Sequence, residues 1–220
     1  MLFLAFSLLM QVAAAAVQNA VVRTFDEDKI GAPPADFIVA AGRDAPPDAW
    51  RVQREGVGRV LLHEGRPSPA DAFAVAVYSG AQYQNVEATV RLKATGGGRT
   101  AGVVWRYQDP LNHYAVFLDL TRQRLALYRV SSGNRIRLES EDDLQLDPDA
   151  WHTLRVLQDE GEIRIYLGGI RVMTERDRQP RVSGAIGVAS SGDTTALFDD
   201  VRIEEVTVGS AKSGRSRDRQ

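Results

Sequence analysis

The sequence predicts an all-β protein, an antiparallel two-sheet β-sandwich of the jelly-roll type. About thirteen short apolar or alternating runs are separated by turn residues at intervals of roughly ten residues, which is typical of sandwiches. No segment carries apolar residues at i, i+3, i+4 and i+7 over three turns, so no amphipathic helix is expected. The stretch 102–130 is the most informative, because three alternating runs in it follow one another without a helical period.

The predicted elements begin with a strand at residues 21–25. Residues 31–49 hold four prolines and are expected to form an extended connection with little ladder pairing, because proline has no N–H donor. Residues 86–93 alternate four apolar with four polar side chains, as a strand with one buried and one wet face does. The remaining predicted strands are residues 50–53, 60–63, 73–78, three within 102–130, 151–157, 163–167, 170–173, 184–189 and 196–208.

Two further features concern the connections. Gly168 and Gly169 separate two strands and give the strongest hairpin signal, because a type I′ turn needs positive φ at both central residues. The acidic run 139–149 is expected to be a solvated loop, and the first and last strands are expected to pair with each other.

Composition narrows the class of function. At 220 residues and 44% hydrophobic content, the chain suits one domain that buries about 70% of its unfolded surface. It contains no cysteine, which excludes disulfides, thiol catalysis, thiolate zinc sites and iron–sulfur clusters. Its net charge of −2 gives no sign of a nucleic-acid surface.

The two ends of the chain differ from its middle. Residues 1–16 are expected to be a signal peptide, since a short apolar run precedes four alanines that suit signal peptidase. The run is too short for a bilayer, which needs about 20 apolar residues. No Lys or Arg precedes it, so a buried N-terminal helix is the alternative. We therefore expect a protein exported to the periplasm or beyond, with one domain at 17–208 and a disordered basic tail at 209–220.

Several motifs, in order, resemble the concanavalin A-like lectin/glucanase superfamily. The closest resemblance is to its bacterial secreted branch, related to laminin-G-like domains and to the 3-keto-disaccharide hydrolase (DUF1080) domain. The motifs are Gly-Val-Val-Trp-Arg-Tyr from residue 102, Asp-Pro-Leu-Asn-His-Tyr from 109, Arg-Leu-Ala-Leu-Tyr-Arg-Val from 124, Trp-His-Thr-Leu-Arg-Val from 151, Glu-Ile-Arg-Ile-Tyr-Leu-Gly-Gly from 162, Gly-Ala-Ile-Gly-Val from 184 and Phe-Asp-Asp-Val from 198.

The resemblance implies a curved sandwich whose concave face meets a saccharide. Three functions follow from it: a non-catalytic carbohydrate-binding module, a glycan-active hydrolase of the 3-keto-disaccharide type, or an adhesion domain that binds a protein. Family-16 glucanases in this superfamily carry Glu-x-Asp-x-x-Glu on one strand. The acidic cluster at 139–143 lacks that spacing, so a binding module is favoured over this hydrolase chemistry.

The ligand-contact candidates cluster around one turn. Arg106, Asn112 and His113 flank residues 107–111, and Tyr83 or Tyr107 would supply the aromatic platform that sugar sites use beside planar polar groups. The alternative is that Asn112 only shapes the turn and that Arg106 pairs with a carboxylate.

Strand alternation would put Arg106 on the face opposite Trp105 and Tyr107, beside Gly102. The glycine would leave room for a ligand above the arginine. We therefore favour Arg106 as a ligand contact, because its planar fork suits hydroxyl or carboxylate groups.

The sequence offers one candidate metal site. Asp26, Asp199 and Asp200 would meet if the first and last strands pair, and such carboxylates suit a structural calcium ion. The alternative is a solvated group of acidic strand ends. The three histidines have no zinc-ligand spacing, and no other cofactor is expected.

Overall fold

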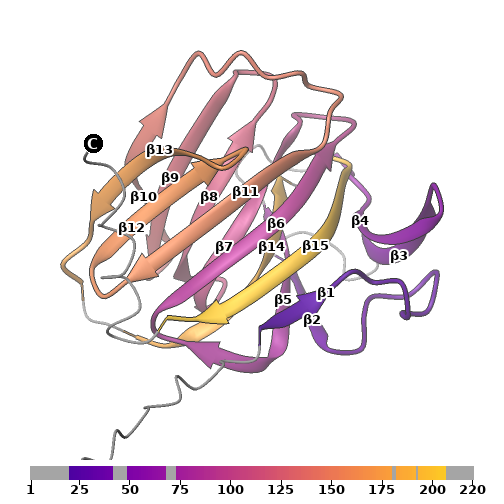
Figure 1. Ribbon diagram of the computed structural model, residues 1–220, viewed down its shortest axis with the longest axis horizontal. Helices are drawn as coiled ribbons and strands as arrows, with labels where there is room; N and C mark the ends of the chain where they lie inside the picture. Colours follow the sequence, from indigo (N-terminus) through magenta and orange to yellow (C-terminus); the bar gives the residue numbers. More distant parts are fainter. Residues whose placement is uncertain (1–19, 42–48, 68–72, 180–181, 192, 207–220) are drawn as a thin grey trace, which may run out of the picture.

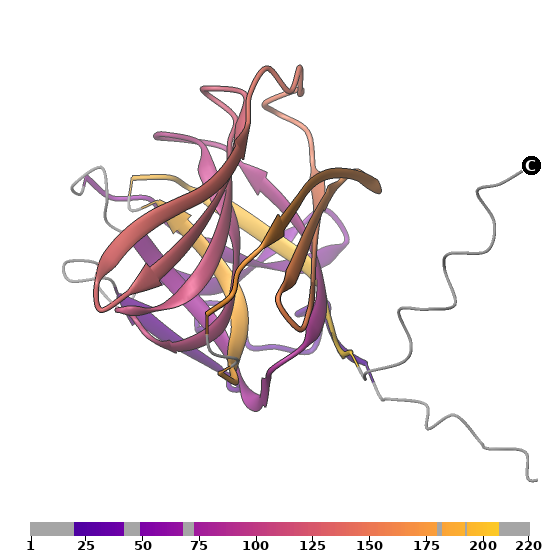
Figure 2. The same ribbon diagram turned by 90° about the vertical axis from the view of Figure 1, so that its left-hand side faces the viewer.

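The computed structural model describes residues 20–41, 49–67, 73–179, 182–191 and 193–206. They form two antiparallel β-sheets packed face to face (Figure 1 and Figure 2), which confirms the predicted fold class. No α-helix occurs in these ranges, so they hold no helical segment fit to span a membrane. The predicted signal peptide and basic tail lie outside the described residues.

Fifteen strands make up the two sheets. They are β1 (Val21–Arg23), β2 (Phe37–Ala41), β3 (Trp50–Glu55), β4 (Gly58–His63), β5 (Phe73–Tyr83), β6 (Val86–Ala94), β7 (Thr100–Asp109), β8 (Asn112–Asp119), β9 (Arg124–Ser131), β10 (Asn134–Glu141), β11 (His152–Asp159), β12 (Glu162–Leu167), β13 (Ile170–Arg176), β14 (Gly184–Ser191) and β15 (Ala196–Glu205).

The larger sheet has eight strands in the order β13-β12-β11-β6-β15-β4-β3, with β1 paired to β15 beside this path. The smaller sheet has seven strands in the order β10-β9-β8-β7-β14-β5-β2. Pairing of the first and last strands is thereby confirmed, with Val21 opposite Ile203. The predicted β12–β13 hairpin is also confirmed, and its two glycines have φ of 58° and 85°.

Two strands were not predicted, and both are edges of the seven-stranded sheet. β2 lies inside the proline-containing stretch 31–49, where an extended connection was expected, and it pairs with β5. β10 takes in the first three residues of the acidic run 139–149, where a loop was expected, and it pairs with β9. Each has one neighbour in its sheet, so neither shows the strong burial pattern of an inner strand.

The main core lies between the two sheets. The apolar residues of β6, from Val86 to Leu92, are fully buried, as their alternation predicted. Trp105 on β7 is also fully buried, and its Nε1 donates to Oε1 of Gln158 on β11 at 2.5 Å. This bond joins the two sheets and satisfies an indole N–H that burial would otherwise leave without a partner.

A second polar link joins the sheets at the end of β13. Asp177, with a side chain 5% exposed, accepts hydrogen bonds from the Tyr114 hydroxyl at 2.9 Å and from Arg129 Nη1 at 2.8 and 2.9 Å. The backbone N–H of Gln179 donates to the same carboxylate at 3.0 Å. Burial, followed by the bond to Asp177, raises the pKa of Tyr114 to about 12, so this phenol stays a donor.

Candidate functional site

The predicted contact Arg106 lies at one end of the seven-stranded sheet and is 2% exposed. Its Nε donates to the carbonyl of Gln84 at 2.8 Å, in the β5–β6 turn. Its Nη2 donates to the carbonyl of Glu160 at 3.1 Å, in the β11–β12 turn of the other sheet. The guanidinium therefore links two turns at this end of the sandwich, and its role as a ligand contact stays a prediction.

A β-bulge explains this position of Arg106. Its φ is 46°, and the register shifts here against both β8 and β14. The expected alternation is therefore wrong: Trp105 faces the core between the sheets, whereas Tyr107 faces outward with Val104. One extra residue reverses the alternation of every side chain that follows it.

The expected room beside Gly102 is also absent. A Cβ built on Gly102 would lie 1.8 Å from the carbonyl oxygen of Val116 on β8. The glycine therefore allows a close approach of two backbones and opens no space for a ligand.

The other predicted contacts lie near the same sheet end but face different ways. Asn112 donates to both carboxylate oxygens of Asp109 at 3.1 Å and shapes the β7–β8 turn. His113 and Tyr107 lie on the outer face with ring centroids 5.5 Å apart. Tyr83 packs into the main core. The sequence thus predicted the clustering of these residues correctly, while the tertiary structure decided their directions.

Burial shifts the pKa values of three of these rings. It lowers the pKa of His113 and raises the pKa of Tyr107 to about 12, because the charged form of each ring loses water. Burial likewise raises the pKa of Tyr83. The Tyr107 hydroxyl has no hydrogen-bond partner among the described residues. At neutral pH these rings are uncharged and packed against protein.

The three aspartates proposed for calcium lie near one another. Asp199 and Asp200 lie at a bulge in β15, where the outer neighbour of this strand changes from β4 to β1. Arg91 Nη1 lies 2.8 Å from Asp200 and 3.7 Å from Asp199, and Asp26 accepts the backbone N–H of Arg59 at 2.9 Å. Burial raises the pKa of Asp199. Within the described ranges, no three His, Cys, Asp or Glu side chains gather as a metal site.

We expect calcium to leave the stability of the protein unchanged, because Arg91 already supplies a positive charge to this group. Calorimetric melting in calcium and in EDTA tests this. A ligand that binds only the folded state raises the melting temperature. If calcium clearly raises the melting temperature of the native protein and does not raise that of Asp199→Asn, the ion binds to these aspartates.

A hollow lies elsewhere, on the outer face of the seven-stranded sheet. This sheet curves, as the edge view in Figure 2 shows. Although the face points away from the other sheet, it carries a second buried apolar cluster that includes Val75, Val104 and Phe117. Several positions on this face are small, among them Ala126 and Ala189, and small side chains leave space above a sheet.

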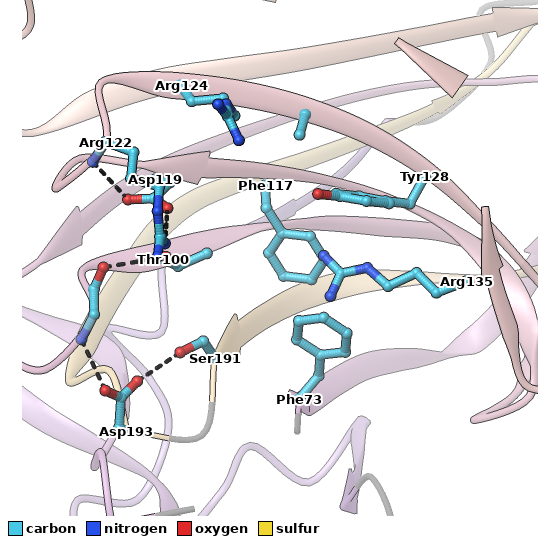
Figure 3. Close-up of a pocket in the computed structure, with 12 residues that line it drawn as sticks. Phe73, Thr100, Phe117, Asp119, Arg122, Arg124, Tyr128, Arg135, Ser191 and Asp193 are labelled. Atoms are coloured by element: carbon cyan, nitrogen blue, oxygen red, sulfur yellow. Dashed lines mark hydrogen bonds and ion pairs between the residues drawn. The ribbon is translucent and has the colours of Figure 1, made fainter. Parts of the chain in front are cut away.

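A cleft of about 350 Å³ opens over this face (Figure 3). That volume lies near the lower end of the roughly 300–1,000 Å³ common for small-ligand sites. It is lined by Phe73, Gly98, Thr100, Phe117, Asp119, Arg122, Arg124, Ala126, Tyr128, Arg135, Ser191 and Asp193.

Aromatic rings form one side of the cleft. Phe73 and Phe117 stack with centroids 4.6 Å apart and an interplanar angle of 16°. Tyr128 meets Phe117 edge to face at 6.3 Å. The guanidinium of Arg135 lies over these rings. Such a wall suits the apolar faces of a ligand.

Polar groups form the other side. Asp193 accepts hydrogen bonds from the Ser191 hydroxyl at 2.7 Å and from the Gly98 backbone N–H at 3.1 Å (Figure 3). Asp119 accepts from the Arg122 backbone N–H at 2.8 Å and from its guanidinium at 2.9 Å. Both carboxylates are therefore held in place across the cleft from the rings, with further lone pairs for hydroxyl donors.

Sequence reasoning missed this site although part of its signal was present. Alternation along β8 and β9 puts Phe117 and Asp119 on one face with Ala126 and Tyr128, and these residues lie inside the stretch 102–130. Further contributions come from β5, β10, the end of β14 and the β14–β15 turn, which are distant in the sequence. Only the strand order reveals that they share a face.

Fold and cleft together define a jelly-roll β-sandwich of the concanavalin A-like class, as the resemblance implied. The chain belongs to the family of 3-keto-alpha-glucoside-1,2-lyase-like domains, whose model matches residues 41–204. A comparison with curated proteins gives no match.

Solved structures with similar folds include several proteins of carbohydrate metabolism. The carbohydrate binding module CBM66 from Bacillus subtilis is 17% identical over 77% of this chain and 96% of its own, with a TM-score of 0.60. The Bacillus licheniformis beta-glucanase is 12% identical over 87% and 100%, with a TM-score of 0.59. Domain 4 of AbnA, a GH43 arabinanase from Geobacillus stearothermophilus solved with arabinotriose, is 14% identical over 84% and 93%, with a TM-score of 0.57. At these identities the likeness concerns the fold.

Proposed function

We propose that this protein is an exported carbohydrate-binding domain that holds a short saccharide in the cleft of its seven-stranded sheet. The observation that carries the proposal is the cleft itself, in which three aromatic rings face two fixed carboxylates. Sugars need this combination, because their C–H faces pack on rings while their hydroxyls donate to carboxylates. The family match, and similar folds that include a carbohydrate binding module, support the same class of ligand.

Export rests on the sequence of residues 1–16. Sequencing the amino terminus of the native protein tests it. A mature chain that begins near residue 17 in the periplasm or medium is expected, whereas a chain that retains Met1 in the cytoplasm would contradict export.

Replacing Tyr128 by alanine is expected to weaken saccharide binding about fivefold or more, since an aromatic contact contributes about 1 kcal/mol beyond area burial. A glycan array identifies the ligand, and calorimetric titration of native and variant protein measures the effect. Tyr166→Ala is the matched control, because Tyr166 is also half-buried beneath an arginine, Arg155 at 3.7 Å, but lies on the other sheet. Equal affinity of both variants would place the ligand outside the cleft.

A second candidate function is cleavage of a glycosidic bond, and the family match favours it. In a 3-keto glucoside the C2 proton is acidic, because it lies next to the ketone. A base would take that proton while the C1–O bond breaks and the leaving oxygen gains a proton. Asp119 and Asp193 are the cleft carboxylates available for these two roles.

One assay separates the two functions. Turnover of 3-keto and ordinary glucosides by the native protein, lost in Asp119→Asn or Asp193→Asn, would establish an enzyme. Binding without turnover would leave the protein a binding module.

A further inference from the structure

Arg135 has an unusual place in the cleft. It extends from the edge strand β10, and its Cζ lies 3.8 Å from the ring centroid of Tyr128, 4.3 Å from that of Phe73 and 5.4 Å from that of Phe117 (Figure 3). The faces of aromatic rings are electron-rich and attract a cation. Three rings therefore hold one guanidinium in position before any ligand enters.

The charged groups of the cleft differ between its two sides. Asp193 lies away from Arg135, beside Ser191 (Figure 3). Asp119 is already paired with Arg122, and Arg124, which also lines the cleft, is paired with Asp142, so much of the charge of these groups is compensated within the protein. A ligand in the cleft would meet a cation on the ring side and hydroxyl acceptors on the opposite side.

From this polarity, and resting on the proposed saccharide-binding function, we infer that the cleft selects saccharides that carry a carboxylate, such as uronic acids. The carboxylate pairs with Arg135, and the ring hydroxyls donate to Asp193. The planar fork of a guanidinium matches a carboxylate with two parallel hydrogen bonds. A guanidinium has five N–H donors, so Arg135 can keep protein partners and still bind this group.

The position of Arg135 over the aromatic rings strengthens the preference for saccharides that carry a carboxylate. The rings exclude water from the faces of the guanidinium, and a charge with less water around it interacts more strongly with an opposite charge. The rings also restrict the side chain, so little conformational entropy is lost when the ligand binds.

A titration with matched sugars tests the inference. A panel of disaccharides is offered to the full-length protein, each in its neutral form and with the terminal sugar oxidised to a uronate. We expect the uronate form to bind about tenfold tighter or more, as a charge-assisted hydrogen bond allows. Arg135→Met is expected to lose this preference while its affinity for the neutral form changes little. Arg137→Met is the control, because Arg137 lies on the same strand outside the cleft lining.

The outcomes separate the inference from the proposed function. Equal affinity for neutral and acidic sugars would overturn the inference and leave saccharide binding intact. A preference that survives in Arg135→Met would overturn the role of Arg135. Absence of binding to every sugar, with a negative glycan array, would overturn the proposed function and the inference with it.

Discussion

Replacing Asp177 by alanine is expected to lower the free energy of unfolding by about 3–5 kcal/mol, the cost of breaking a buried ion pair by removing one partner. The variant leaves the guanidinium of Arg129 and the hydroxyl of Tyr114 without the carboxylate that both contact. Because Asp177 follows β13 in the larger sheet while its partners lie on β8 and β9, the loss also loosens the contact between the sheets.

Urea denaturation of the native and variant proteins measures this effect. Glu204→Ala provides the comparison, since its pair with Arg202 is largely exposed and such pairs contribute about 0–1 kcal/mol. If Asp177→Ala and Glu204→Ala lower the free energy of unfolding by the same small amount, the buried network does not stabilise the sandwich.

Gly102→Ala is expected to cost about 3 kcal/mol, the upper part of the usual range for overpacking. The added methyl group would meet the carbonyl oxygen of Val116, which belongs to the backbone of an inner strand and cannot rotate away. Relief requires that β7 and β8 separate near the floor of the cleft, so saccharide affinity should fall together with stability.

Gly96→Ala serves as the control for this prediction. Its added methyl group would lie 3.7 Å from Thr195, an ordinary contact, and the φ of Gly96 is not positive. We expect unchanged or slightly higher stability, because alanine restricts the unfolded chain. A melting temperature of Gly102→Ala equal to that of Gly96→Ala would show that the two strands adjust without cost.

The cleft also explains why the outer face of one sheet is so apolar. Phe117 and Val104 would be exposed on an ordinary outer face, yet both are buried, and the guanidinium of Arg135 lies over the ring of Phe117. The outer face of the larger sheet also carries a smaller buried apolar cluster, formed by Val60, Leu62 and Leu197, together with ion pairs such as Arg155 with Glu87.

The sequence by itself determined the class of the fold and thirteen of the strands, because most of these strands bury at least one face and this burial dictates their alternation. It did not reveal the two edge strands of the smaller sheet. β10 is mostly exposed and β2 follows a pair of prolines, and each has a single neighbour to pair with.

The tertiary structure alone decided the site. A bulge at Arg106 turned the side chain of this predicted ligand contact away from the outer face. The hydrophobic periodicity of a sequence does not predict where a bulge occurs. The insertion of β14 between β5 and β7 brought Phe73 and Asp193 into the same cleft as Phe117. Strand order is set by the packing of the whole sandwich, so residues distant in the sequence meet in one cleft only after the chain has folded.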